Sequence, residues 1–187
     1  MQLTLVAIGK DEASLAEFDR THIGAAELVL VANTQGEPLS TIANRHLARS
    51  RDVFGLCHVD TWFGPGSLEI FAQTALAGKI CGVVGRSLDG VYHWCQGNPD
   101  RVSTLDGSSV FFAVRCGLRF DEATCNGFHC HVEDLCLQAR KRGMDVLVPA
   151  ADATHRGGNH GGKWNDDYFR YVAILRNKWK GVPFLTV

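Results

Sequence analysis

The sequence predicts an α/β fold with a mostly parallel central sheet and helices on both faces. Short apolar runs alternate with amphipathic segments along most of the chain, which is the pattern of repeated strand–helix–strand units. The first run, Leu3–Gly9, is apolar for nearly its whole length, as parallel strands covered on both faces are. A length of 187 residues suits one domain, 1–187, with a single core.

The first half of the chain contains three predicted strands and three predicted helices. Strands are expected at the apolar runs Leu3–Gly9, Glu27–Ala32 and Val53–Cys57. Helices are expected where apolar residues recur at helical spacing, in Asp11–Arg20, Thr41–Arg49 and Ser67–Leu76. Gly78 follows the last of these as a stop signal.

The second half continues the alternation after one interruption. Further strands are expected at Ile80–Gly85, Val110–Val114 and Asp145–Pro149, and Asp166–Lys178 is expected to form the closing helix. The interruption, Arg86–Arg101, is rich in turn residues and predicts a loop or a β-hairpin. Its Tyr92-His93-Trp94 run fits either a stacking wall for a sugar or base, or a small satellite cluster.

The composition excludes several classes of protein. A hydrophobic fraction of 45% with 21% charged residues is typical of a folded globular chain. The net charge of −1 gives no electrostatic reason to expect nucleic acid or an anionic membrane as partner. No apolar run approaches the roughly 18–20 residues that cross a bilayer, so we expect a soluble, cytoplasmic protein.

The cysteines predict reduced thiols. Their number, seven, is odd, and no two of them form a C-x-x-C pair. A zinc site built from Cys125, His129, Cys130 and His131 is an alternative, although this spacing is not that of a finger or a ribbon.

An acidic pair opens a predicted helix in the middle of the second half. The helix is indicated by Val132, Leu135, Cys136 and Ala139, which fall at i, i+3, i+4 and i+7. Glu133 and Asp134 therefore lie in its first turn, where carboxylates complement the helix dipole without any chemistry. Three other polar features that follow or interrupt apolar runs favour a functional role: His58-Val59-Asp60, Asp106-Gly107 and His155.

The first of these features predicts a metal site. His58 and Asp60 are two residues apart at the end of a strand, so their side chains point to the same side. This arrangement suits a divalent metal bound to a diphosphate. The alternative is that Asp60 caps the loop Gly64-Pro65-Gly66.

Two loops provide further candidates. His155 lies at the root of a glycine-rich loop and is a candidate third metal ligand, while Arg156 and Lys163 provide positive charge for a phosphate. The alternative is a solvated loop. Asn33 and Thr34 follow the second strand and are candidate contacts for a base or ribose, or else local turn residues.

The order of these features resembles the GT-A-fold glycosyltransferases, specifically the inverting family-2-like group and its small bacterial and phage-borne relatives. The likeness runs from about residue 28 to residue 179. It rests on Leu105-Asp106-Gly107, Arg119-Phe120-Asp121-Glu122, Phe128-His129, Glu133-Asp134-Leu135-Cys136-Leu137, Gly143, His155 and Lys178-Trp179. The resemblance implies a GT-A-like (Rossmann-like) fold.

The resemblance also implies roles for individual residues. His58-Val59-Asp60 takes the place of the family's D-x-D element, so Asp60 would bind Mn²⁺ or Mg²⁺, with His58 replacing the first aspartate. His155 would be the late metal ligand. Asp134 would be the general base and Glu133 a supporting group. The donor and its nucleotide would contact residues at strand ends and loops: Ala7, Ile8, Asn33, Thr34, Asp106, Gly107, Arg156 and Lys163.

The sequence thus favours a metal-dependent inverting glycosyltransferase that uses a nucleotide-sugar donor. A non-catalytic nucleotide-sugar-binding module and a metal-dependent hydrolase of nucleotide sugars are the alternatives. The acceptor is left open between a glycan or lipid-linked sugar and a hydroxylated DNA base. The DNA hypothesis rests on basic residues in the C-terminal half: Arg140, Lys141, Arg142, Arg156, Lys163, Arg170, Arg176, Lys178 and Lys180.

Overall fold

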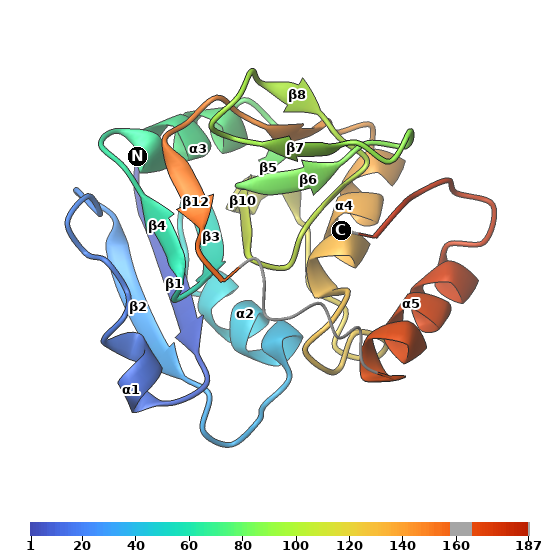
Figure 1. Ribbon diagram of the computed structural model, residues 1–187, viewed down its shortest axis with the longest axis horizontal. Helices are drawn as coiled ribbons and strands as arrows, with labels where there is room; N and C mark the ends of the chain where they lie inside the picture. Colours follow the sequence, from blue (N-terminus) through green and yellow to red (C-terminus); the bar gives the residue numbers. More distant parts are fainter. Residues whose placement is uncertain (158–165, 187) are drawn as a thin grey trace.

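The computed structural model describes residues 1–157 and 166–186 and is built on a seven-stranded sheet (Figure 1). The strand order is β2-β1-β3-β10-β5-β11-β8. These strands are β2 (Glu27–Ala32), β1 (Leu3–Gly9), β3 (Val53–His58), β10 (Ser109–Ala113), β5 (Ile80–Cys81), β11 (Val146–Val148) and β8 (Asp100–Arg101). All except β10 and β8 run in one direction, so the predicted mostly parallel sheet is confirmed.

Several predicted elements have the expected bounds, namely β1, β2, α3 (Ser67–Leu76) and α5 (Asp166–Lys178). Two N-terminal helices differ. Helix α1 is only Glu12–Leu15. The capping box of Asp11 and Ser14 fixes its start, and beyond its end the Asp19 carboxylate accepts from the Thr21 N–H in a turn. Helix α2 (Leu39–Leu47) starts earlier than predicted, directly after Pro38.

The predicted strand Ile80–Gly85 is divided into β5 and β6 (Val84–Arg86). The division falls at Gly82, where an added Cβ would lie 2.5 Å from the Ser109 carbonyl oxygen. Beyond it the chain forms a separate sheet of β6, β7 (Tyr92–Trp94) and β9 (Thr104–Leu105), in the order β7-β6-β9. The segment expected as a loop or hairpin therefore contains strand β7, which is paired with β6.

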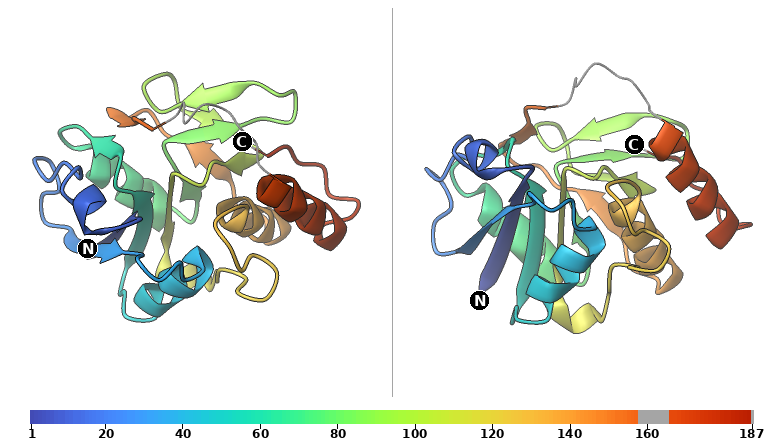
Figure 2. Two further views of the ribbon diagram at one scale, coloured as in Figure 1. Left: turned by 60° about the horizontal axis from the view of Figure 1, so that its bottom comes forward. Right: turned by 90° about the horizontal axis from the view of Figure 1, so that it is seen from below.

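Helices cover both faces of the central sheet, as predicted (Figure 2). Successive side chains of β10 point to opposite faces. Phe111 stacks on Phe71 of α3 with ring centroids 4.7 Å apart. Phe112 faces the other way, with its ring 5.6 Å from Phe54 and 6.2 Å from Phe120. That second face is covered by α2 and α4 (His131–Lys141).

Helix α5 packs outside α4 and forms a second, smaller core. This core contains Leu137 of α4 and four buried residues of α5: Tyr168, Tyr171, Val172 and Leu175. The helix can dock closely because Gly127 has no side chain, since a Cβ there would lie 2.2 Å from the Tyr171 hydroxyl. None of the described helices is long and apolar enough to cross a membrane.

The cysteines are free thiols, as predicted. Six of the seven are buried, and Cys116 is partly exposed. Among the described residues, Cys125, His129, Cys130 and His131 do not form a group that could hold a metal ion, so the alternative of a zinc site there is not supported.

Gly55 of β3 is a closely packed point of the core, opposite Phe111 of β10. A Cβ at this position would lie 2.6 Å from the Phe111 ring, which is itself fixed between β3 and Phe71. We expect Gly55→Ala to lower the free energy of unfolding by about 1–3 kcal/mol through overpacking. Chemical denaturation measures this, with Gly97→Ala as the control, because its Cβ would find its nearest neighbour at 3.4 Å. Equal stabilities of the two variants would contradict the packing argument.

Candidate functional site

The C-terminal ends of β1, β2 and β3 meet at one edge of the sheet. Ile8 of β1 is in register with Val31 of β2 and with His58 of β3. The N–H of Asn33 donates to the Gly9 carbonyl oxygen at 2.8 Å, which keeps the loop after β2 beside the end of β1. The three predicted positions Ile8, Asn33 and His58 are therefore brought together, as parallel strands require.

His155 reaches the same edge through a separate two-stranded sheet. Strand β12 (Ala153–His155) pairs antiparallel with β4 (Thr61–Phe63), and His155 is in register with Thr61. The N–H of Arg156 donates to the Asp60 carbonyl oxygen at 2.9 Å. This pairing places His155 beside Asp60, although the two are far apart in the sequence.

His58, Asp60 and His155 form a cluster that could hold a metal ion. Their ligand atoms all lie within 4.8 Å of one another, and no other such group occurs among the described residues. The His155 Nε2 atom is 3.2 Å from Asp60 Oδ1, and its Nδ1 atom is 3.8 Å from Asp106 Oδ2. The arrangement agrees with the ligand set that the sequence predicted.

The charges of this cluster are mutually stabilising. Burial alone would raise the pKa of Asp60, but the contact with His155 and the charges of His155 and His58 outweigh it and lower that pKa to about 2. Burial alone would likewise lower the pKa of His155, but Asp60 and Asp106 together raise it. A divalent cation bound here would take the place of the proton on His155.

A pocket of about 400 Å³ opens beside the cluster. Its lining consists of Ile8, Gly9, Lys10, Ser14, Glu17, Asn33, Leu39, His58, Val59, Asp60 and Phe128. Of the predicted donor contacts, Ile8 and Asn33 line it, whereas Ala7 is buried within β1 and Thr34 is exposed outside it. The Asn33 side-chain amide accepts from the Glu37 N–H and donates to its carbonyl oxygen, so it serves the local turn.

The sequence did not single out three residues of this pocket, Lys10, Ser14 and Glu17. Lys10 directly follows β1, and the other two belong to the short α1 region. The sequence signal that could have identified these residues is their position after the C-terminal end of the first strand.

Phe128 lies on the loop before α4, and this residue is 56% exposed. Its ring stacks on His58 with centroids 5.4 Å apart and an interplanar angle of 28°.

Arg156 lines a smaller pocket of about 130 Å³ on the other side of Asp60. Its guanidinium lies 5.8 Å from the centre of the Trp62 ring. Asp19 and Glu17 complete the polar side of this pocket. Arg156 therefore lies next to the cluster of His58, Asp60 and His155, where its positive charge would pair with a bound phosphate. Lys163, predicted for the same role, lies outside the described residues.

The Asp106-Gly107 turn connects the cluster to α4. Asp106 Oδ1 accepts from the Ser108 N–H at 3.1 Å, and burial raises the pKa of Asp106. The turn is fixed on β3, because the N–H of His58 donates to the Ser108 carbonyl oxygen at 2.9 Å. A Cβ at Gly107 would lie 3.7 Å from the His131 ring, so Gly107 packs against the first residue of α4.

Helix α4 begins at a strained residue. Cys130, at the N-cap, has φ 63, and it is the only non-glycine residue with positive φ in the part of the chain that the structure describes. Backbone strain of this kind, about 1–3 kcal/mol, tends to be kept at functional sites. His131 follows it and is buried, which lowers its pKa to about 3.

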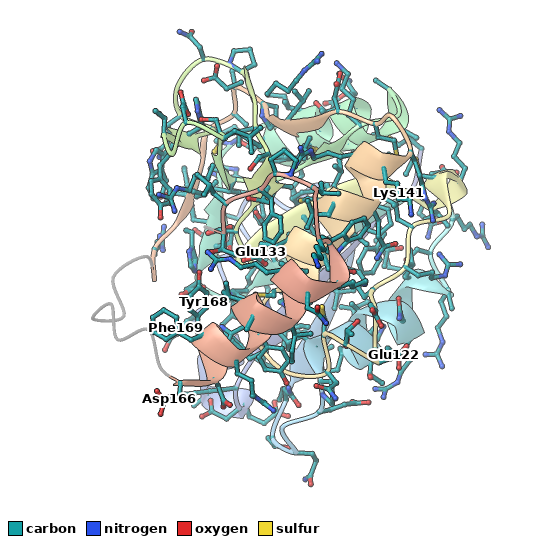
Figure 3. The ribbon with its side chains drawn as sticks, turned by 90° about the vertical axis from the view of Figure 1, so that its right-hand side faces the viewer. Glu122, Glu133, Lys141, Asp166, Tyr168 and Phe169 are labelled. Atoms are coloured by element: carbon teal, nitrogen blue, oxygen red, sulfur yellow. The ribbon has the colours of Figure 1, made fainter. Side chains whose placement is uncertain are left out.

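The two carboxylates in the first turn of α4 have different environments. Asp134 is fully buried and held by three donors: Lys178 Nζ at 2.6 Å, Trp179 Nε1 at 2.7 Å and Gln138 Nε2 at 2.8 Å. Glu133 is also buried, but its Oε2 atom has no hydrogen-bond partner among the described residues. Burial, together with the charges of Asp106 and Asp134, raises the pKa of Glu133 to about 8. Figure 3 shows Glu133 beside α5.

Comparisons with known proteins identify the fold. No protein-family model and no curated protein matches the chain. The crystal structure of GalNAc-T7 with UDP, GalNAc and Mn²⁺ is similar to 96% of the chain, with a TM-score of 0.63. The chain spans about half, 48%, of that protein's chain. Because the sequence identity is 8%, the similarity shows a GT-A-like fold and not an activity.

Lys178 is expected to be essential for stability. Its ammonium lies 2.6 Å from the buried Asp134 carboxylate and 2.6 Å from that of Asp121. We expect Lys178→Met to lower the free energy of unfolding by about 3 kcal/mol, because Asp134 then keeps a buried charge without its cation. Chemical denaturation of this variant and of an exposed control, Lys180→Met, measures the difference. Partial recovery in Lys178→Met/Asp134→Asn supports the explanation, and no loss in the single variant refutes it.

Glu133 is expected to make stability fall as pH rises. Its folded-state pKa, about 8, lies above the ordinary 4.5, so the folded protein holds a proton that the unfolded chain releases. The contribution is fully present below pH 4.5 and is lost as pH rises through about 8, by about 1.4 kcal/mol per pKa unit. Glu133→Gln should therefore be increasingly more stable than the wild type from pH 5 to about pH 9.

Urea denaturation at a series of pH values measures this difference. The control is Glu69→Gln, an exposed position in α3. A difference between Glu133→Gln and the wild type that does not change with pH would show that Glu133 is ionised in the folded protein.

Proposed function

We propose that the protein is a metal-dependent glycosyltransferase that moves a sugar from a nucleotide-sugar donor to an acceptor hydroxyl. The observation that carries the proposal is the cluster of His58, Asp60 and His155 at the strand ends of a GT-A-like sheet, beside a pocket of about 400 Å³. The similar structure of GalNAc-T7 contains UDP, GalNAc and Mn²⁺, and this proposal places the same kinds of ligand at that edge.

The donor atoms of the cluster favour Mn²⁺ over Mg²⁺. The cluster offers two imidazole nitrogens and one carboxylate oxygen, whereas Mg²⁺ prefers oxygen ligands throughout. The residues therefore fit a divalent transition metal, with Asp60 supplying the charge and His58 and His155 the nitrogen ligands. When bound, such an ion supplies electrostatic stabilisation to the leaving nucleoside diphosphate.

We assign the proton acceptor to Glu133 and a positioning role to Asp134. This reverses the roles that the resemblance implied, because Asp134 is fully enclosed by Lys178, Trp179 and Gln138. Glu133 has an unpartnered oxygen among the described residues and a pKa near neutral pH, which suits a general base. Glu133 would take the proton of the acceptor hydroxyl as that oxygen attacks the anomeric carbon. Direct displacement of this kind inverts the anomeric configuration.

The remaining predicted contacts bind the donor in this proposal. Ile8 and Asn33 line the pocket for the nucleoside, and Ala7 supports that wall from within β1. Arg156 and Lys163 provide charge for the diphosphate, and Asp106-Gly107 lies toward the transferred sugar. Thr34 is exposed outside the pocket, so this proposal assigns it no contact. The prediction of one domain over residues 1–187 and that of a cytoplasmic location stay predictions.

A thermal-shift screen tests the proposal. Nucleoside diphosphates and nucleotide sugars are each combined with Mn²⁺, Mg²⁺ or EDTA. At 100 times its dissociation constant, a donor adds about 2.7 kcal/mol, which raises the melting temperature by several degrees. We expect stabilisation by one nucleotide class, larger with Mn²⁺ than with Mg²⁺ and absent with EDTA.

The matched variants are Asp60→Ala and Asp100→Ala. Asp100 also pairs with a histidine, His93, at 2.9 Å, but outside the cluster. The nucleotide response should disappear in the first variant and persist in the second. No response to any nucleotide contradicts the proposal. Binding without turnover would indicate a non-catalytic module, and donor cleavage without transfer would indicate a hydrolase.

A further inference from the structure

Four aromatic side chains form a row that starts at the metal cluster. Phe128 stacks on His58, and His129 meets the Phe128 ring edge-on with centroids 5.4 Å apart. Tyr168 lies edge-on to His129 at 5.5 Å, and Phe169 extends the row at 5.6 Å from Tyr168. We call Phe128, His129, Tyr168 and Phe169 the ring row. It joins the loop before α4 to the first turn of α5.

The two ends of the ring row are open to solvent. Phe128 and Phe169 are each 56% exposed, whereas Tyr168 between them is 9% exposed. The Tyr168 hydroxyl donates to Thr186 Oγ1 at 2.7 Å, which fixes the middle of the row. Exposed aromatic surface next to polar catalytic groups is typical of a ligand-binding groove.

The ring row also adjoins the proposed base. Burial raises the pKa of the Tyr168 phenol. The negative charge of the nearby Glu133 raises this pKa further. Figure 3 shows Glu133, Tyr168 and Phe169 on the side of the molecule that α5 covers. Glu133 itself is 4% exposed, so the open ends of the row provide the surface for a ligand next to this residue.

The charges around the row disfavour a polyanion. Asp166 and Asp167 are exposed at the start of α5, next to Phe169. Several basic residues that suggested DNA are engaged within the protein. Lys178 pairs with Asp121 and Asp134, Arg170 pairs with Asp167, and Arg140 and Arg142 donate to the Pro183 and Cys116 carbonyl oxygens. A phosphate backbone at this surface would find these cations already engaged, and it would be repelled by the carboxylates of Asp166 and Asp167.

We propose that the ring row is the acceptor site and that it binds an uncharged saccharide. One face of a sugar ring carries C–H groups, which pack well on the electron-rich face of an aromatic ring. In this arrangement the sugar stacks on Phe169, at the exposed end of the row. The assignment as acceptor rests on the proposed function, but the binding itself can be measured without turnover.

Saturation-transfer NMR tests the site with the methyl glycosides of common hexoses and N-acetylhexosamines. The protein is studied with UDP and the diamagnetic ion Mg²⁺. We expect at least one glycoside to bind, with its ring C–H protons receiving most of the saturation. Phe169→Ala and Phe169→Leu should weaken this binding by about two- to tenfold, because an aromatic stack adds about 0.5–1.5 kcal/mol beyond area burial.

Two further variants separate stacking from general effects. Phe169→Trp keeps the stack and should retain binding. Leu88→Ala, an equally open position at 50% exposure on the turn between β6 and β7, should leave glycoside binding unchanged. UDP binding, measured in the same samples, should be unaffected by the changes at Phe169, which does not line the donor pocket.

Each failure has a distinct meaning. Glycosides that do not bind, or that bind equally to Phe169→Ala, overturn the acceptor site even when UDP binds normally. Failure of UDP and every other nucleotide to bind overturns the proposed function, while glycoside binding that depends on Phe169 would still support a saccharide site. Binding of a single-stranded oligonucleotide that depends on Phe169 overturns the choice of an uncharged ligand.

Discussion

The pairing of β10 with β3 is the constraint on which the rest of the structure depends. Five residues of β10 pair antiparallel with β3, and Phe111 of the same strand pairs with β5. Strand β10 thus joins the parallel group β2-β1-β3 to the group β5-β11-β8 in one sheet. The turn that precedes β10 carries Asp106 and Gly107, so the same hydrogen bonds that close the sheet bring this turn to the metal cluster and to the start of α4.

Carboxylates of the site acquire different properties from their surroundings alone. Asp60 faces two histidines and keeps a low pKa, whereas Glu133 is buried near two other acids and has a raised one. Asp134 is neutralised by a lysine that arrives from α5. Such separation of acidic groups would let one site combine the proposed metal binding with the proposed proton removal near neutral pH.

The sequence predicted what local patterns and strand ends determine. The bounds of β1, β2, α3 and α5 were predicted correctly, because apolar periodicity and stop signals act over a few residues. The cluster of His58, Asp60 and His155 was predicted as a set, from the end of a strand and the root of a glycine-rich loop, and the family resemblance implied the same three residues. The division of β5 from β6 was missed, because the close approach of the Ser109 backbone to Gly82 and the hydrogen bond from the Val83 N–H to Ser109 Oγ join residues far apart in the sequence. The exposure of Phe128 could not be predicted either, because hydrophobic periodicity does not describe the conformation of a loop.

The tie between α4 and α5 has a consequence for how the protein can change. The residues that line the proposed nucleotide pocket lie before Thr61 except for Phe128, whereas Glu133 and Phe169 lie on two helices of the second half that Asp134 and Lys178 hold together. Substitutions in the α4–α5 interface can therefore alter the space between Glu133 and Phe169 while leaving the residues that line this pocket unchanged. Under the proposed function, the acceptor range would then change separately from the donor choice, and a library restricted to α5 would explore the one without disturbing the other.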